Sequence, residues 1–336
     1  MKSIIICFFS IILFQSCEKS VIGAAQVTPL AVFNEAPNNS FTDLINFNGD
    51  YYCVFREGSS HISFDGKLRV VKSSDAKNWN NFALLSVTSK DLRDPHFFVD
   101  NNYSLTISTN ARDISGAHQN IFFKLENDSF FESKKITVDN NYWLWSFSKW
   151  KENLYSIGYN IFQPCLNTFI NSAKPKIIFF QNQDSAFTSF KNVQIQNFIA
   201  NNFNCPSETS IAFTPDSTAI AIVRDEEPQN SSHIGISKFP FVNWQWQLFP
   251  YYVRGPKLTM LQDGRIFLCA ASMVDYNKTY YAILNANNFS IQAIKTFPSG
   301  GDTGYPGVII EGNTALISYY SSHEGSARVY IVRTNY

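Results

Sequence analysis

The sequence lacks an excess of charge of either sign. Its 336 residues hold 27 Lys plus Arg and 27 Asp plus Glu, so the formal net charge is zero. Proteins that bind nucleic acid normally present a basic surface, and the composition therefore favours no nucleic-acid partner. After Phe14 no apolar run approaches the length of a membrane span, so we expect the rest of the chain to be soluble.

Helical periodicity and linkers are missing as well. No segment of any length repeats its apolar residues at helical spacing. No stretch is rich enough in Pro, Gly or Ser to separate two domains. We therefore expect a single domain with little helix.

Cysteine is scarce, and its spacing is uninformative. Beyond residue 17 the chain has Cys53, Cys165, Cys205 and Cys269. These spacings match no metal motif and indicate no particular disulfide pairing. We expect buried or unpaired thiols, with disulfides as the open alternative, and we expect neither a metal ion nor a cofactor.

The N-terminus has the features of an export signal. Lys2 precedes an apolar run from Ile4 to Phe14, which is too short to cross a bilayer, and Ser16 and Cys17 follow. This pattern resembles a bacterial lipoprotein signal, with an ordinary secretory signal as the alternative. It implies a signal peptide over 1–17, lipidation at Cys17, a tether over 18–30 and a folded domain over 31–336. The protein would then be exported and anchored to a membrane, in the periplasm or at the cell surface.

Strand signals dominate from Ala31 onward. Two apolar runs flank Asn48-Gly49, which is a strong hairpin signal. Runs such as "KLRVVKSS", "NIFFKLEND" and "TAIAIVRDE" follow at short and regular distances. Many short strands at this spacing indicate a sandwich, a barrel or a propeller.

A repeated turn favours the propeller. The stretch "SSDAKNW", Ser73 to Trp79, resembles the Asp-box of sialidase-type propellers, although it is one residue short and has Ala76 and Lys77 in the turn. Weaker copies surround Asp184 and end at Trp244. Units of about 50 residues are typical of four-stranded blades. We predict an all-β, six-bladed propeller, with five blades as the alternative, and we expect a strand near Ala31 to close the last blade against the C-terminal "ARVYIVR".

Four positions extend this resemblance to the sialidase superfamily. "PSETSIAFTPDSTAIAIVRDE" is similar to the family's Glu and Arg phrases and contains Glu208 and Arg224. "GYPGVIIEGNTALISYY" is similar to the nucleophile phrase and contains Tyr305, and "CVFREG" contains Arg56. The resemblance implies that Tyr305 is the nucleophile, Glu208 its base, and Arg224 and Arg56 substrate-binding residues. A neutral phenol suits a sugar whose carboxylate would repel an anionic nucleophile.

The chain departs from the family in its other binding residues. The stretch "NSFTDL" has no Arg where the family has its first one. Lys278 is the nearest cation to the third Arg position, and Arg254 is a less well placed substitute. His61 comes before Asp65 in the acid position, and histidine can act as a general acid near neutral pH.

A separate phrase, Arg93-Asp94-Pro95, resembles the "RDP" motif of five-bladed furanosidases. That resemblance implies that Asp94 stabilises the transition state or works as a catalytic carboxylate, with Arg93 beside it. The aromatic cluster Tyr142 to Trp145 is expected in a blade core, with one Trp able to stack on a sugar.

Three functions remain open on this basis. The first is a sialidase-type glycoside hydrolase that releases sialic acid or another acidic sugar from a glycan. The second is a glycosidase of another class that uses Asp94 and Glu208, and the third is a glycan-binding propeller without catalysis. Each residue also has a structural interpretation, such as blade packing for Tyr305 and a surface ion pair for Arg224.

Overall fold

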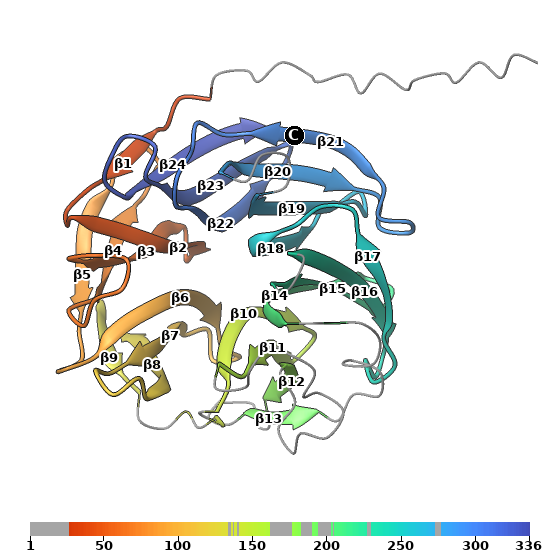
Figure 1. The fold of residues 1–336 in the computed structure, drawn as a ribbon, viewed down its shortest axis with the longest axis horizontal. Helices are drawn as coiled ribbons and strands as arrows, with labels where there is room; N and C mark the ends of the chain where they lie inside the picture. Colours follow the sequence, from red (N-terminus) through yellow and green to blue (C-terminus); the bar gives the residue numbers. More distant parts are fainter. Residues whose placement is uncertain are drawn as a thin grey trace, which may run out of the picture.

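The protein is a six-bladed β-propeller (Figure 1). The computed structural model describes residues 27–133, 136, 138–139, 141–161, 177–182, 190–193, 203, 205–226, 230–272 and 277–336. In these ranges, 24 strands form six four-stranded antiparallel sheets around a central axis, and no residue is helical. The prediction of six blades is confirmed, and the alternative of five is wrong.

Each of the first three blades uses four consecutive strands. Blade 1 consists of β2 (Asn38–Phe47), β3 (Asp50–Gly58), β4 (Lys67–Ser73) and β5 (Asn80–Leu85). Blade 2 consists of β6 (Asp91–Val99), β7 (Leu105–Arg112), β8 (His118–Glu126) and β9 (Ser129–Glu132). Blade 3 consists of β10 (Trp143–Trp150), β11 (Asn153–Tyr159), β12 (Ile177–Asn182) and β13 (Phe190–Val193).

The remaining blades follow the same order until the last. Blade 4 consists of β14 (Pro206–Phe213), β15 (Thr218–Asp225), β16 (Ser231–Lys238) and β17 (Gln245–Phe249). Blade 5 consists of β18 (Arg254–Met260), β19 (Ile266–Ala271), β20 (Thr279–Leu284) and β21 (Ile291–Thr296). Blade 6 consists of β22 (Thr303–Glu311), β23 (Thr314–Ser321), β24 (Arg328–Asn335) and β1 (Ala31–Phe33).

The ring closes where β1 adds to β24 as the outer strand of blade 6. Ala31 pairs with Ile331 and Phe33 with Val329, as the sequence predicts. The ring of Phe33 stacks on that of Phe55 in blade 1, with centroids 5.4 Å apart. This pairing covers the edge of β24 and leaves the three-residue β1 as the short outer edge of the blade.

The hydrophobic core lies between neighbouring blades. Val54 and Leu68 of blade 1, for example, form one buried cluster with Leu92 and Ile107 of blade 2. Alternate residues of the strands point toward opposite faces of a sheet, so each blade packs against the blade on either side.

The Asp-box stretch forms the turn between β4 and β5. One carboxylate oxygen of Asp75 accepts hydrogen bonds from the backbone N–H groups of Lys77 and Asn78, both at 2.8 Å. The indole of Trp79 donates to the carbonyl of Ala76 at 3.2 Å. In blade 4 the indole of Trp244 bonds the residue three positions before it in the same way, at 3.0 Å. The copy around Asp184 lies outside the described residues.

A β-bulge interrupts the inner strand of all six blades. The pairing register shifts at residues 41–42, 94–95, 145–146, 207–208, 255–256 and 305–306. The backbone has a positive φ at Phe41 (56°), Asp94 (46°), Gly255 (53°) and Tyr305 (52°). Bulges re-aim side chains and are common beside active sites. The six inner strands surround the axis (Figure 1), so their six bulges also lie around it.

The cysteines divide into two kinds. Cys53 and Cys269 are buried free thiols. Cys205 is disulfide-bonded, so the expectation of an unpaired thiol is wrong at this position. Cys17 and Cys165 lie outside the described residues. Within the described ranges, no helix is long and apolar enough to span a membrane.

Candidate active site

A hydrogen bond joins Tyr305 of blade 6 to Glu208 of blade 4, although 97 positions separate them in the chain. The phenol donates to Glu208 Oε1 at 2.5 Å. Tyr305 is partly buried, and Glu208 is only 5% exposed. Both residues lie in the bulges of their inner strands. The local irregularity of two distant strands therefore brings a hydroxyl and a carboxylate into direct contact.

Three donors hold the carboxylate of Glu208. Besides the phenol, Arg224 Nη1 donates to Oε1 at 2.6 Å, and the backbone N–H of Gly255 donates to Oε2 at 2.7 Å. Arg224 Nε in turn donates to the hydroxyl of Tyr252 at 2.8 Å. Burial lowers the pKa of Arg224, but the charge of Glu208 outweighs it and the pKa is raised well above its ordinary value. Arg224 is therefore charged and serves as the partner of Glu208.

The phenol of Tyr305 is neutral at pH 7. Burial raises its pKa well above the ordinary value, the charge of Glu208 raises it further, and Arg224 opposes both. A free tyrosinate is therefore disfavoured, and the proton can leave only as another group takes it. Glu208 Oε1, which accepts the hydrogen bond from the phenol, is placed to take this proton.

Asp94 adds a second carboxyl group from the bulge of blade 2. Its side chain is buried, and its Oδ1 atom makes no hydrogen bond within the described residues. Burial raises the pKa of Asp94 to about 7, although the charge of Arg93 opposes the rise and that of Glu208 adds to it. The two carboxyl groups thus have different surroundings. Three donors contact the carboxylate of Glu208, whereas no donor contacts Asp94 Oδ1 in the described structure.

Arg93 lies beside this carboxyl group. Its Nη1 atom donates to the carbonyl of His61 at 2.6 Å and to Asp91 at 3.2 Å. Its guanidinium lies over the ring of Phe41, 4.7 Å from the centroid. Burial lowers the pKa of Arg93, but the charges of Asp94 and Asp91 outweigh it and the pKa is raised, so Arg93 remains a cation. The ring of Phe41, over which Arg93 lies, is 5.0 Å from the ring of the candidate nucleophile Tyr305.

Arg56 has a supporting position. It is fully buried, and its Nε atom bonds Asp91 at 2.7 Å. Its terminal nitrogens donate to the carbonyl of Ser60 at 2.9 Å and to the hydroxyl of Ser63 at 2.7 Å. Arg56 thus fixes the β3–β4 loop and the Asp91 that contacts Arg93, and it is not accessible to a substrate.

His61, in the same loop, reaches blade 6. Its Nδ1 atom lies 2.7 Å from Asp302 Oδ2, and Tyr320 donates to the other oxygen of Asp302 at 2.7 Å. Burial raises the pKa of Asp302, but these bonds and the charge of Arg254 outweigh it and the pKa is lowered. A carboxylate thus holds the imidazole in place, a role that the sequence did not assign to Asp302.

Two other predicted residues have local roles. Lys278 donates to the carbonyl of Ser299 at 2.6 Å, and no contact joins it to Tyr305 or Glu208 among the described residues. Asp65 accepts the backbone N–H of Ser59 at 3.2 Å within its own loop. The substitute cation is Arg254. It is the neighbour in sequence of Gly255, whose N–H bonds Glu208, whereas Lys278 has no such link to the cluster in the described structure.

Four polar side chains around the cluster have buried atoms without a hydrogen-bond partner in the described structure. These atoms are Asp94 Oδ1, His96 Nε2, Trp145 Nε1 and Nε and Nη2 of Arg254. The Trp145 ring lies 5.4 Å from that of Tyr305. Burial lowers the pKa of His96 to about 4, so its ring is neutral at pH 7. Because buried polar atoms normally have partners, this set indicates a site for a polar ligand or ordered water.

The described residues contain no group of three or more His, Cys, Asp or Glu side chains that could hold a metal ion. The chemistry available in this part of the chain is therefore that of a phenol, two carboxyl groups, an imidazole and several guanidinium groups.

Several solved structures have a fold similar to that of this protein. A protein of unknown function from Dyadobacter fermentans has a TM-score of 0.73 at 16% identity, over 93% of this chain and 100% of that one. An α-L-arabinanase from Penicillium chrysogenum, in complex with arabinobiose, has a TM-score of 0.66 at 11% identity, over 93% and 97%. A sialidase from Trypanosoma rangeli has a TM-score of 0.61 at 11% identity, over 92% of this chain and 58% of that one. The likeness is one of fold. No protein-family model and no curated protein matches the sequence.

Proposed function

We propose that the protein is a glycoside hydrolase of sialidase type, which releases a terminal sialic acid or another acidic sugar from a glycan. The observation that carries this proposal is the 2.5 Å hydrogen bond from Tyr305 to Glu208. A phenol bonded to a buried, arginine-paired carboxylate is an arrangement suited to nucleophilic catalysis, because the carboxylate can accept the proton during attack. Enzymes of known glycosidase activity among the structures with this fold support the same class.

The reaction would proceed in two displacements. Tyr305 Oη attacks the anomeric carbon while Glu208 takes the phenolic proton, and Asp94 protonates the leaving oxygen as the glycosidic bond breaks. Water then attacks the same carbon with Asp94 as the base, and Tyr305 recovers its proton from Glu208. Two inversions give net retention of configuration. Asp94 suits the acid role because its pKa is about 7.

Two cations support an acidic substrate. Arg93 lies over the ring of Phe41, which is 5.0 Å from the ring of Tyr305, and the charge of Asp94 raises the pKa of Arg93 against burial. Arg254 has two buried nitrogen atoms without a partner in the described structure, and it precedes Gly255. Guanidinium groups bind carboxylates through paired N–H donors. Arg224, by contrast, is committed to Glu208.

A second candidate function is a glycosidase that uses Asp94 and Glu208 without a tyrosine nucleophile. It is favoured by the buried Asp94 with its unpartnered oxygen and raised pKa. In this mechanism Asp94 is the acid and Glu208 the nucleophile or base, and Tyr305 only positions Glu208.

One variant separates the two mechanisms. Tyr305→Phe removes only the hydroxyl, so we expect the fold to persist and kcat on a chromogenic acidic glycoside to fall by about a thousandfold or more. The panel would also contain a chromogenic arabinofuranoside. The matched control is Tyr103→Phe, on an exposed tyrosine, which should keep full activity. Glu208→Gln should lose as much activity as Tyr305→Phe. Full activity in Tyr305→Phe with loss in Asp94→Asn and Glu208→Gln would exclude the tyrosine mechanism, and no turnover of any glycoside would leave the glycan-binding alternative.

We also propose export and membrane attachment through a lipid on Cys17. The disulfide at Cys205 supports an oxidising compartment outside the cytoplasm. Cys17→Ala should move the protein from the membrane fraction to the soluble fraction, because acyl chains supply the affinity for the bilayer. A variant that is exported and still sediments with membranes would contradict this proposal.

A further inference from the structure

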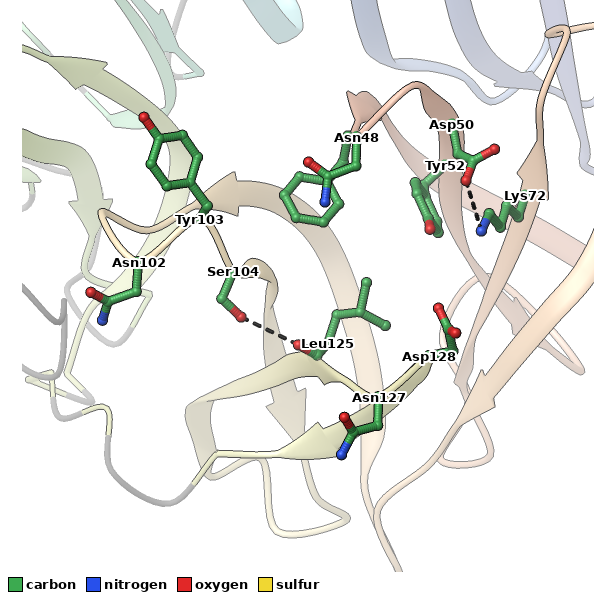
Figure 2. A pocket seen from close by; sticks show the side chains of 11 residues that line it. Asn48, Asp50, Tyr52, Lys72, Asn102, Tyr103, Ser104, Leu125, Asn127 and Asp128 are labelled. Carbon is green, nitrogen blue, oxygen red and sulfur yellow. Dashed lines mark hydrogen bonds and ion pairs between the residues drawn. The ribbon is translucent and has the colours of Figure 1, made fainter.

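A polar pocket lies between blades 1 and 2 (Figure 2). It is at the ends of the strands away from the candidate active site. The inner strand β2 passes the site at Phe41 and ends at Phe47, which lines this pocket. At about 3.3 Å per residue, six residues separate the two by roughly 20 Å. The pocket has a volume of about 470 Å³ and is formed by the β2–β3, β6–β7 and β8–β9 turns.

The lining offers uncommitted hydrogen-bonding groups. Asn48, Asn102, Asn127 and Asp128 are all exposed, and their side chains make no hydrogen bond to any other described residue. An amide presents a donor and an acceptor at fixed spacing, and a carboxylate presents two acceptors. Adjacent hydroxyl groups of a sugar have the matching pattern, since each can donate and accept.

The charges in the pocket disfavour an anionic ligand. Lys72 is the cation of the lining, and it is paired with Asp50 at 2.8 Å and lies over the ring of Tyr52 at 5.3 Å. Asp128 adds a negative charge without a cationic partner in the described structure. A neutral ligand rich in hydroxyl groups fits this balance better than a sugar acid or a phosphate does.

An aromatic side chain stands at the rim. Tyr103 is 81% exposed and projects from the β6–β7 turn (Figure 2). The flat face of such a ring suits the C–H face of a pyranose or furanose. The apolar atoms of Leu125 and Phe47 complete the lining.

We propose that this pocket is a non-catalytic binding site for a neutral oligosaccharide. The site is independent of the chemistry at Tyr305 and Glu208. It would attach the protein to an uncharged region of a polysaccharide while the opposite end of the propeller remains free. Attachment at this pocket would raise the effective concentration of the glycan at any other glycan-binding site on the molecule.

The test is calorimetric titration of the whole protein with xylohexaose, cellohexaose and a linear arabinohexaose, with hexagalacturonate as the acidic comparison. We expect at least one neutral hexasaccharide to bind, and Tyr103→Ala and Asn127→Ala each to weaken that binding about tenfold or more. Both residues are exposed, but each has a positive φ, 55° at Tyr103 and 47° at Asn127, so alanine should lower the melting temperature slightly. The titrations are therefore run well below the melting temperature of each variant. Tyr305→Phe should bind the neutral sugar as the unmodified protein does, which separates this site from the proposed active site.

Phe239→Ala is the matched control, because Phe239 is 59% exposed and lines another pocket formed by turns of blades 4 and 5. The proposal is overturned if no neutral hexasaccharide binds, if Tyr103→Ala and Asn127→Ala bind unchanged, if Phe239→Ala alone loses binding, or if hexagalacturonate binds as tightly.

Discussion

At the scale of single residues, Asp94 is protonated in a pH range where most carboxylic acids are ionised. Burial raises its pKa to about 7 from an ordinary value of 3.8. The side chain keeps a free Oδ1 atom in the described structure, so no donor compensates for the lost water. A group of this kind is suited to giving a proton to a leaving oxygen, and it makes the stability of the fold depend on pH.

The sign of that dependence follows from the raised pKa. Below about pH 4 both the folded and the unfolded protein hold the proton, and between about pH 4 and 7 only the folded protein does. The contribution of Asp94 to stability is therefore present at low pH and is lost as the pH rises through 7. We expect the stability of Asp94→Asn relative to the unmodified protein to increase from pH 4 to 7, as measured by urea unfolding.

Asp65→Asn is the control for this experiment. Hydrogen bonds from Ser63 and Ser59 lower the pKa of Asp65, so its substitution should give no such increase. A relative stability of Asp94→Asn that stays constant with pH would show that Asp94 has an ordinary pKa in the folded protein.

At the scale of the strands, the site depends on bulges. Gly255 lies in the bulge of β18 with φ at +53°, and its N–H bonds Glu208. A Cβ atom there would lie 3.0 Å from the Cα, N and Cγ atoms of Tyr305. Glycine is therefore required for its backbone conformation and for the close approach of Tyr305.

Gly255→Ala should displace Tyr305 or Glu208 and lower kcat by about a hundredfold. The control is Gly312→Ala, in the β22–β23 turn. Gly312 also has a positive φ, at 58°, but a Cβ there would meet nothing within 4 Å. Both variants bear similar backbone strain, and Gly255→Ala adds the contact with Tyr305, so its melting temperature should fall at least as far as that of Gly312→Ala. Only Gly255→Ala should lose activity. Equal activities in the two variants would show that this contact does not position the site.

The sequence predicted strands and turns better than it predicted the site. The hairpin at Asn48-Gly49 and the closure near Ala31 follow from local turn chemistry and strand patterns, and both are present. Tyr305 and Glu208 were predicted from motif resemblance, and the structure brings them together. Lys278 was preferred to Arg254 because sequence distance was the only guide.

Proline is a local sequence signal for three of the six bulges. Pro95, Pro256 and Pro306 each occupy the second bulge position of an inner strand. Proline lacks an N–H and occurs in sheets mainly on edge strands and at bulges. Trp145 and Asp302 carried no such signal, because their positions depend on strands paired far along the chain.

At the scale of the whole molecule, stability depends on the three residues of β1. They pair with β24, and Phe33 stacks on Phe55 in the next blade. A chain that begins at residue 34 would expose the edge of β24 and leave the ring of Phe55 without this contact. We expect it to melt about 5 °C or more lower than a chain that begins at residue 27, and to aggregate on heating. Calorimetry and light scattering would measure both, and equal melting temperatures would show that closure contributes little.

The pairing of β1 with β24 also has a consequence in time. Among the described strands the ribosome makes β1 first and its partner β24 last, so Ala31 has no partner until Ile331 has been synthesised. Contacts between such distant parts of a chain form slowly, because a large loop must close first. A nascent or truncated chain that ends before Arg328 has no partner for β1, so blade 6 stays incomplete until β24 has been synthesised.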